Sequence, residues 1–210
     1  MSGEPTGIVS GLLSIGRLVD DLSRIKRATA GRDDQPESDT THSMMTAMAA
    51  FYIASQVAPG QRTMKLVMTA LIHDLHEARC GDTDSFRITD EDREAKRVRE
   101  YNARNDTASE LPVGFATYIH TAAHPSTCPE AAVAHWVDKM MPKVMHIINM
   151  CASLNRRGEN DPAKLREYLH KQRDQLVYET MDVLEPVTLQ ALHDLWNELT
   201  EEVCACLSGS

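Results

Sequence analysis

The sequence predicts an all-α fold, a bundle of about seven or eight helices. Apolar residues recur at the three- and four-residue spacing of amphipathic helices along almost the whole chain. The alternation of apolar and polar residues that indicates a half-buried strand is absent. Only 5% of the residues are aromatic, so Leu, Ile, Val, Ala and eleven Met residues must fill the core. A chain of 210 residues suits one domain with a substantial core better than two.

Glycine- and proline-rich segments separate the helices expected in the first half. A loop over residues 29–41 follows the first helix, and its last residues Asp39, Thr40 and Thr41 are N-cap candidates for the second. Gly81 is a plausible C-cap for the third helix. The expected helices cover residues 8–27, about 42–54 and 61–78, and a turn-rich loop covers residues 81–90.

Proline residues begin or end the helices expected in the second half. Thr89 and Asp90 can cap a strongly charged helix, and Pro125 stops the short helix that comes next. Pro142 should kink the following helix about one turn after Asp138. The expected helices cover residues 92–106, 111–124, 130–154, about 162 onward, and 186 to about 207.

The composition argues against a membrane protein and against a dedicated nucleic-acid binder. No apolar run approaches the roughly 20 residues that a membrane span needs. The net charge of −9 disfavours a nucleic-acid surface, although a few Arg or Lys residues suffice to bind one phosphate. The N-terminal apolar patch has no basic residue before it, so we do not interpret it as a signal peptide. Five cysteines without a CxxC spacing indicate a reduced, cytoplasmic chain.

The segment LIHDLHEARCGD carries the strongest chemical pattern. His73 and Glu77 lie four residues apart on one helix face, and Asp74 is rotated by about 100° from His73. Imidazole and carboxylate together suit a borderline divalent ion such as Mn, Co, Zn or Ni. Further ligands must come from elsewhere, and His42 and Asp138 are candidates. Asp138 lies in the apolar segment WVDKM, where a buried carboxylate needs a metal, a lysine or a helix cap as its partner.

Other readings of these residue types remain open at this point. His120 and His124 are four residues apart and could clamp a metal, but Pro125 ends their helix immediately. Glu77 taken alone is more typical of a helix-surface carboxylate. Asp82 taken alone is typical of a turn residue.

The order His42, His73-Asp74, Asp138 resembles the H…HD…D signature of the HD-domain phosphohydrolase superfamily, with spacings of 31 and 64 residues. PESDTTHS resembles the family's E-S-x-x-x-H-[ST] segment, and HDLHEARCGDT resembles H-D-x-x-E-x-x-x-G-D. The latter is found in the branch of the YfbR-type deoxynucleoside 5′-monophosphatases and in the phage dATP triphosphohydrolases called DatZ. Arg27 lies fifteen residues before His42, where the YfbR branch keeps an arginine.

The resemblance implies a helical HD-domain bundle that holds one divalent metal. Mn, Co, Zn, Ni or Fe is the expected ion, with Mg as a further candidate. Glu77 would orient or deprotonate the attacking water, with assistance from Asp82. Arg27, Arg87 and Lys96 would bind phosphate, although a solvated basic face accounts equally well for the last two. The implied metal ligands are His42, His73, Asp74 and Asp138.

The expected organisation is one domain over residues 1–210, with a core at about 20–150 and C-terminal helices at about 162–207 packed on it. The expected activity is hydrolysis of (deoxy)nucleoside 5′-monophosphates to nucleoside and phosphate. The alternatives are a deoxynucleoside triphosphate triphosphohydrolase of the DatZ kind and a non-catalytic module that binds metal or nucleotide. The resemblance also implies a homodimer or higher homo-oligomer. We expect neither a nucleic-acid nor a membrane partner.

Two departures from the family pattern affect the substrate. The YfbR branch keeps a tryptophan after the arginine, and Ala28 stands there in this sequence. The loop GDTDSFRI replaces a proline-rich GDxPTP and brings in Asp84, which could change the phosphate chain that fits or make room for a second metal. Sugar, base and phosphate-chain length therefore remain open.

Overall fold

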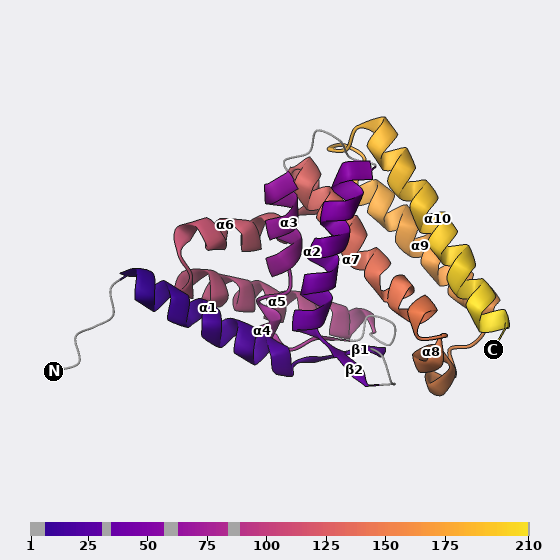
Figure 1. Cartoon of the computed structure of the whole chain (residues 1–210), viewed down its shortest axis with the longest axis horizontal. Helices are drawn as coiled ribbons and strands as arrows, with labels where there is room; N and C mark the ends of the chain where they lie inside the picture. Colours follow the sequence, from indigo (N-terminus) through magenta and orange to yellow (C-terminus); the bar gives the residue numbers. More distant parts are fainter. Residues whose placement is uncertain (1–6, 31–34, 57–62, 84–88, 210) are drawn as a thin grey trace.

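A computed structural model describes residues 7–30, 35–56, 63–83 and 89–209, and it confirms the predicted all-α bundle (Figure 1). The first half contains α1 (Gly7–Arg24), β1 (Lys26–Ala30), β2 (Pro36–Ser38), α2 (Asp39–Gln56), α3 (Thr63–Ile72) and α4 (Glu77–Cys80). The second half contains α5 (Asp90–Glu110), α6 (Val113–Ala122), η2 (Pro125–Thr127), α7 (Pro129–Ile148), α8 (Ala152–Arg157), α9 (Pro162–Thr180) and α10 (Pro186–Ser208). None of the described helices combines the length and the apolarity that a bilayer span requires.

The larger hydrophobic core lies around α7, which packs against α2, α3 and α10. Trp136 of α7 and Trp196 of α10 meet edge to face, with ring centroids 5.8 Å apart. Each indole N–H has a partner, since Trp136 donates to Thr180 Oγ1 and Trp196 donates to the Leu169 carbonyl. The two large rings thereby fix α9 and α10 on the outer side of α7, the helix that carries Asp138.

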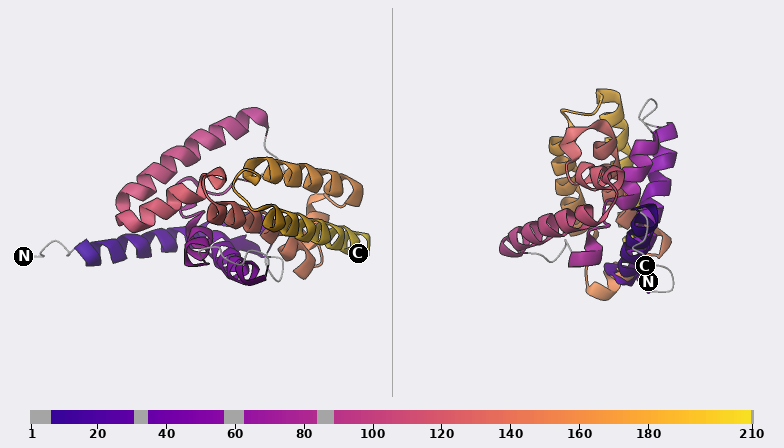
Figure 2. Two further views of the ribbon diagram at one scale, coloured as in Figure 1. Left: turned by 90° about the horizontal axis from the view of Figure 1, so that it is seen from above. Right: turned by 90° about the vertical axis from the view of Figure 1, so that its left-hand side faces the viewer.

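A second, smaller core joins α1 to the start of the predicted metal-binding segment. Leu18 and Leu22 of α1 pack with Ile72, Leu75 and Ile119, and all five are buried. Figure 2 shows α5 and α6 forming a V on one side of the bundle. This second core holds the segment after α3 between α1 and the V.

Three local expectations were wrong. The predicted loop contains an antiparallel hairpin of β1 and β2, so Arg27 lies on a strand after a helix that ends at Arg24. Both strands are too short for alternation to be visible in the sequence. Ser38 rather than Asp39, Thr40 or Thr41 caps α2, because its Oγ accepts the Thr41 N–H at 3.2 Å.

Two predicted helices are each divided in the structure. The helix expected over residues 61–78 ends at Ile72, and residues 73–76 form a turn before α4. The helix expected over residues 130–154 continues through Pro142 but ends at Ile148. Met150 and Cys151 then adopt left-handed φ angles of 49° and 54°, and α8 follows. These breaks give ten α-helices among the described residues in place of seven or eight.

Candidate metal centre

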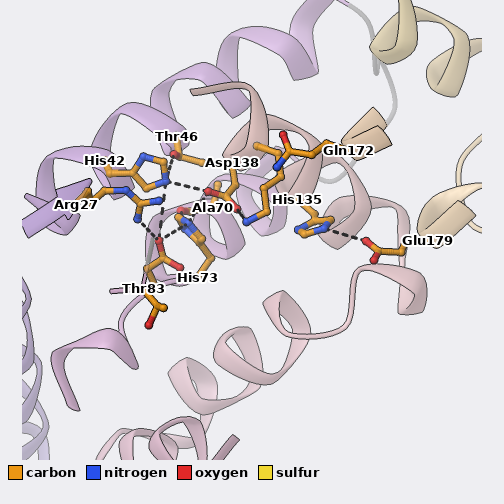
Figure 3. Close-up of polar contacts among 12 residues, drawn as sticks. Arg27, His42, Thr46, Ala70, His73, Thr83, His135, Asp138, Gln172 and Glu179 are labelled. Carbon is orange, nitrogen blue, oxygen red and sulfur yellow. Dashed lines mark hydrogen bonds and ion pairs between the residues drawn. The ribbon is translucent and has the colours of Figure 1, made fainter. Parts of the chain in front are cut away.

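Four predicted ligands from three separate segments meet at one point of the bundle (Figure 3). His42 lies in the first turn of α2, His73 and Asp74 lie in the turn after α3, and Asp138 lies in the middle of α7. The packing of α2, α3 and α7 against one another brings the segments together. One ligand atom from each of the four residues lies within 4.8 Å of the other three.

The contacts within this set are short and use the expected atoms. His42 Nε2 lies 2.9 Å from Asp138 Oδ1 and 3.9 Å from Asp74 Oδ2. His73 Nε2 lies 2.9 Å from Asp74 Oδ2 and 3.3 Å from Asp138 Oδ1. The side chains are nearly buried, with 1% of His42 and 8% of Asp138 exposed. Two imidazoles and two carboxylates in a compact, dry cluster suit a borderline divalent metal.

The hydrogen bonding of His73 tests whether a metal fits. His73 Nδ1 lies 2.7 Å from the Ala70 carbonyl, which can only accept, so Nδ1 carries the proton. With Nδ1 fixed in this way, Nε2 faces the carboxylates of the cluster, 2.9 Å from Asp74 Oδ2, and its lone pair would bind a metal ion in place of a proton. A backbone carbonyl that fixes the ligating tautomer is the usual support of a metal-binding histidine. The residues present therefore fit the ion.

The electrostatics of the cluster favour ionised carboxylates. Burial disfavours charge on every member, yet the charges of Lys139 and His73 hold the pKa of Asp138 well below its ordinary value. Burial disfavours the charge of His73, but the carboxylates of Asp74 and Asp138 raise its pKa to about 10, so a metal ion must displace a proton from this ring when it binds. Burial lowers the pKa of His42 and so favours its neutral ring. Ionised carboxylates and a neutral imidazole are the forms that bind metal.

Arg27 reaches the cluster from strand β1. Its Nη1 donates to Asp74 Oδ2 at 3.0 Å and to Asp39 Oδ1 at 3.1 Å. Burial opposes the charge, but Asp74 and Asp138 raise the pKa of Arg27, so the guanidinium stays cationic. The structure thus places the predicted phosphate-binding arginine in contact with a predicted metal ligand. An anion bound beside that ligand would lie within its reach.

Glu77, predicted to act on water, is the first residue of α4 and only 5% exposed. Burial and the negative charges of Asp74 and Asp39 raise the pKa of Glu77 to about 12. A positive charge beside Glu77 must lower that pKa before the carboxylate can act as a base near neutral pH. Asp82 follows Gly81 at the end of α4, and its Oδ1 accepts the Thr83 N–H at 2.7 Å.

A cleft of about 860 Å³ opens beside the centre, and Lys139 belongs to both. Lys139 Nζ lies 2.8 Å from Asp138 Oδ2. His135, which pairs with Glu179 at 3.1 Å, lies on the other side of Asp138 from Arg27 (Figure 3). The cleft is lined by α5, α7, α9 and the segments around η2 and after α9, and its basic side chains are Arg97, Arg104, His124, His135 and Lys139.

The remaining predicted phosphate ligands, Lys96 and Arg87, are not observed in contact with the four predicted metal ligands. Lys96 Nζ lies 3.4 Å from Glu100 Oε1 and 3.4 Å from the Thr83 carbonyl, so it contacts the residue that follows Asp82. Arg87 and Asp84 lie outside the described residues. His120 and His124 do not belong to any group of potential metal ligands in the described part of the chain.

Sequence reasoning missed two residues of the centre. Asp39 was taken only as a cap, yet it is fully buried and bound to Arg27. Lys139 was not singled out, although a second charge next to Asp138 in an apolar helix was a visible signal. The structure gives Asp138 a lysine partner in addition to a place in the metal-ligand set.

Comparison with known proteins agrees with this geometry. The sequence model of the family described as HD domain matches residues 19–181. A crystal structure described as a predicted metal-dependent phosphohydrolase from Magnetospirillum magnetotacticum MS-1 matches with a TM-score of 0.71. That match covers 94% of this chain and 97% of the other at 20% sequence identity, so it establishes a shared fold alone. None of the curated proteins matches the chain.

Proposed function

The chain belongs to the HD-domain family, and from this we propose that it is a metal-dependent phosphohydrolase that acts on nucleotides. The observation that carries the proposal is the convergence of His42, His73, Asp74 and Asp138 within 4.8 Å, next to Arg27 and to the cleft. The preferred reaction is hydrolysis of a (deoxy)nucleoside 5′-monophosphate to nucleoside and phosphate. The description of the Magnetospirillum protein as a predicted metal-dependent phosphohydrolase supports the metal-dependent class but names no substrate.

The residues of the centre have complementary roles in this reaction. A divalent ion held by the four ligands supplies Lewis acidity, which polarises a phosphoryl oxygen and lowers the pKa of water. Arg27 neutralises charge that develops on the phosphoryl oxygens. Glu77 orients the attacking water and accepts its proton, and Asp82 assists Glu77. Lys139 contacts the phosphate from the side of the cleft, and the cleft receives the nucleoside.

A triphosphohydrolase is the second candidate, and the basic side chains of the cleft favour it. Arg97, Arg104 and Lys139 all line the cleft, and Lys139 is adjacent to the metal ligand Asp138. Several cations in one cleft suit an extended phosphate chain better than one phosphate. The carboxylates Glu100 and Glu179 line the same cleft and offset part of that charge.

Identification of the phosphorus product separates the candidates. We would incubate the protein with a panel of deoxy- and ribonucleoside mono- and triphosphates in Mn²⁺, Co²⁺, Zn²⁺ or Mg²⁺ and assign the products by ³¹P NMR. Orthophosphate from monophosphates supports the first candidate, and intact triphosphate from triphosphates supports the second. If no nucleotide of the panel is cleaved with any ion, the chain is a non-catalytic binding module instead.

A further inference from the structure

One face of α9 forms a wall of the cleft. Gln172, Gln175 and Glu179 all line the cleft, and their spacing of three and four residues places them on the same side of the helix. Gln172 lies on the same side of Asp138 as His135 (Figure 3). This face of α9 is therefore part of the surface that a substrate would meet next to the metal centre.

The two glutamines of this face use their amide nitrogens within the protein. A hydrogen bond with His135 holds the pKa of Glu179 below its ordinary value, so this carboxylate is ionised and only accepts. Gln175 Nε2 donates to Glu179 Oε1 at 2.8 Å, and Gln172 Nε2 donates to Tyr168 Oη at 2.8 Å. Neither glutamine Oε1 has a hydrogen-bond partner in the described part of the chain. Both carbonyl oxygens can thus accept from a molecule in the cleft.

Tyr178 and Met181 give the same wall an apolar surface. Both side chains line the cleft, with 75% of Tyr178 and 49% of Met181 exposed. Tyr178 follows Gln175 by three residues on α9, which is close to one helical turn. A ring exposed in this way can stack on the face of a planar base while the acceptors contact the edge of the base.

The charges of the cleft place a phosphate away from this wall. Glu179 and Asp182 line the α9 side, and carboxylates there repel a phosphate. Lys139 Nζ lies next to the metal ligand Asp138, and Arg27 reaches the metal ligands from β1. The phosphate end of a nucleotide thus belongs beside Lys139 and Arg27, which leaves the base end for α9.

We propose that this wall selects nucleotides whose base carries an exocyclic amino group, namely adenine or cytosine. An amino group has two donor hydrogens on one nitrogen, so it can satisfy the Oε1 atoms of both Gln172 and Gln175. A keto oxygen in the same place, as in hypoxanthine or uracil, would face these oxygens acceptor to acceptor. The inference rests on the proposed function, since it takes a nucleotide to be the molecule that occupies the cleft.

AMP and IMP form a matched pair for the test, because an amino group in one base replaces a keto oxygen in the other while sugar and phosphate stay the same. Phosphonate analogues, in which a methylene group replaces the bridging oxygen, prevent turnover. Isothermal titration calorimetry with the metal-loaded wild-type protein should show binding of the AMP analogue that is tighter by about tenfold or more. Equal dissociation constants, tighter binding of the IMP analogue, or no binding of either would overturn the proposal.

The double variant Gln172→Met/Gln175→Met removes both acceptors and keeps the length of the side chains. Its preference for the AMP analogue should fall to about threefold or less, while its affinity for the IMP analogue stays close to that of the wild type. Gln190→Met is the control, because Gln190 also donates to a carboxylate four residues away, Asp194, but does not line the cleft. An undiminished preference in the double variant, shown by circular dichroism to be folded, would overturn the proposal.

Turnover of the cleavable nucleotides separates this inference from the proposed function. Phosphate release from AMP and IMP with equal kcat/KM contradicts base selection and leaves the phosphohydrolase proposal intact. Tighter binding of the AMP analogue by a protein that cleaves no nucleotide contradicts the enzymatic proposal and leaves base selection intact. CMP and UMP give a second matched pair, and CMP should be preferred for the same reason as AMP.

Discussion

Asp138 shows how single side chains adapt this helical fold to metal and phosphate chemistry. Its carboxylate contacts His42 and His73 through Oδ1 and Lys139 through Oδ2. The histidine side of Asp138 faces the metal ligands, and the lysine side faces the cleft. One buried carboxylate thus connects the two parts of the proposed active site.

Lys139→Gln should weaken substrate binding more than metal binding. Loss of a charge-assisted hydrogen bond to phosphate predicts an increase in KM of about tenfold or more for the best nucleotide substrate. Bound metal per chain should stay unchanged. Lys171→Gln is the control, because Lys171 pairs with Glu167 on the exposed face of α9 and does not line the cleft. Equal KM values for both variants, measured by initial rates, would contradict the assigned role of Lys139.

The resemblance to the HD signature predicted the four metal ligands, and the structure brings these four side chains together. The pairing of Arg27 with Asp39 and Asp74 was not predictable, because it depends on a hairpin that places β1 against the cluster. The burial of Asp39 was missed for a related reason. From the sequence alone, a polar residue at the start of a helix is interpreted as a solvent-exposed N-cap, because the tertiary contacts that bury it are not known.

At the scale of elements, the break between α3 and α4 shapes the centre. The backbone of residues 73–76 leaves the α-helical pattern, and the Leu75 and Glu77 N–H groups donate to the carbonyls of Ile72 and Asp74. Helical periodicity continues through this segment in the sequence, so the break was not predictable from it. The turn allows His73 and Asp74 to point into one cluster while Glu77 begins a new helix.

Gly81 ends α4 in a conformation that only glycine adopts readily, with φ 72° and ψ 161°. Gly81→Ala should lower the free energy of unfolding by about 1–3 kcal/mol from backbone strain alone, since a Cβ there meets no atom within 4 Å. Gly16→Ala in α1 also meets no atom but has helical geometry, so it should raise stability by up to about 1 kcal/mol. Urea unfolding measures the free energy of unfolding of both variants. If Gly81→Ala is as stable as the wild-type protein, the backbone at Gly81 is not strained for other residues.

His146, near the junction of α7 and α8, should make the stability of the protein depend on pH. Burial, followed by the charges of Arg157 and Lys143, lowers the pKa of His146 from 6.5 to about 4. Between those two values the unfolded chain binds a proton that the folded chain does not. This contribution to stability is therefore complete above about pH 6.5 and is lost as the pH falls toward 4, by up to about 3 kcal/mol.

His146→Gln tests this contribution, because glutamine does not titrate. The difference in free energy of unfolding between pH 7 and pH 5, measured with urea, should be smaller in the variant than in the wild-type protein. His76 has a similarly lowered pKa of about 4 and is unchanged in both proteins, so it cancels in the comparison. An identical pH difference in the two proteins would show that His146 does not contribute.

At the scale of the whole molecule, helical periodicity and the absence of strand-like alternation predicted the fold class correctly. The cleft was not predictable, because it is lined by α5, α7 and α9, which are far apart in the sequence. Self-association remains a prediction. Exposed apolar side chains on α2, namely Met44, Met48, Phe51 and Tyr52, offer a surface for it.

Light scattering coupled to size-exclusion chromatography measures the oligomeric state. We expect the mass of a dimer or higher oligomer for the wild-type protein and a shift toward the monomer for Phe51→Glu. Val187→Glu is the control, since Val187 is also exposed but lies at the start of α10. A monomeric wild-type protein at micromolar concentration would contradict the prediction.

The central claim is that His42, His73, Asp74 and Asp138 hold the metal that phosphohydrolysis requires. The most direct measurement is phosphate release from a nucleotide by chelator-treated protein, before and after addition of Mn²⁺ or Co²⁺, in wild type and His73→Ala. We predict that the ion restores activity in the wild type. His73→Ala should bind less metal and lose activity on the order of 10³-fold, since metal Lewis acidity contributes several kcal/mol. Wild-type activity in His73→Ala would contradict the claim.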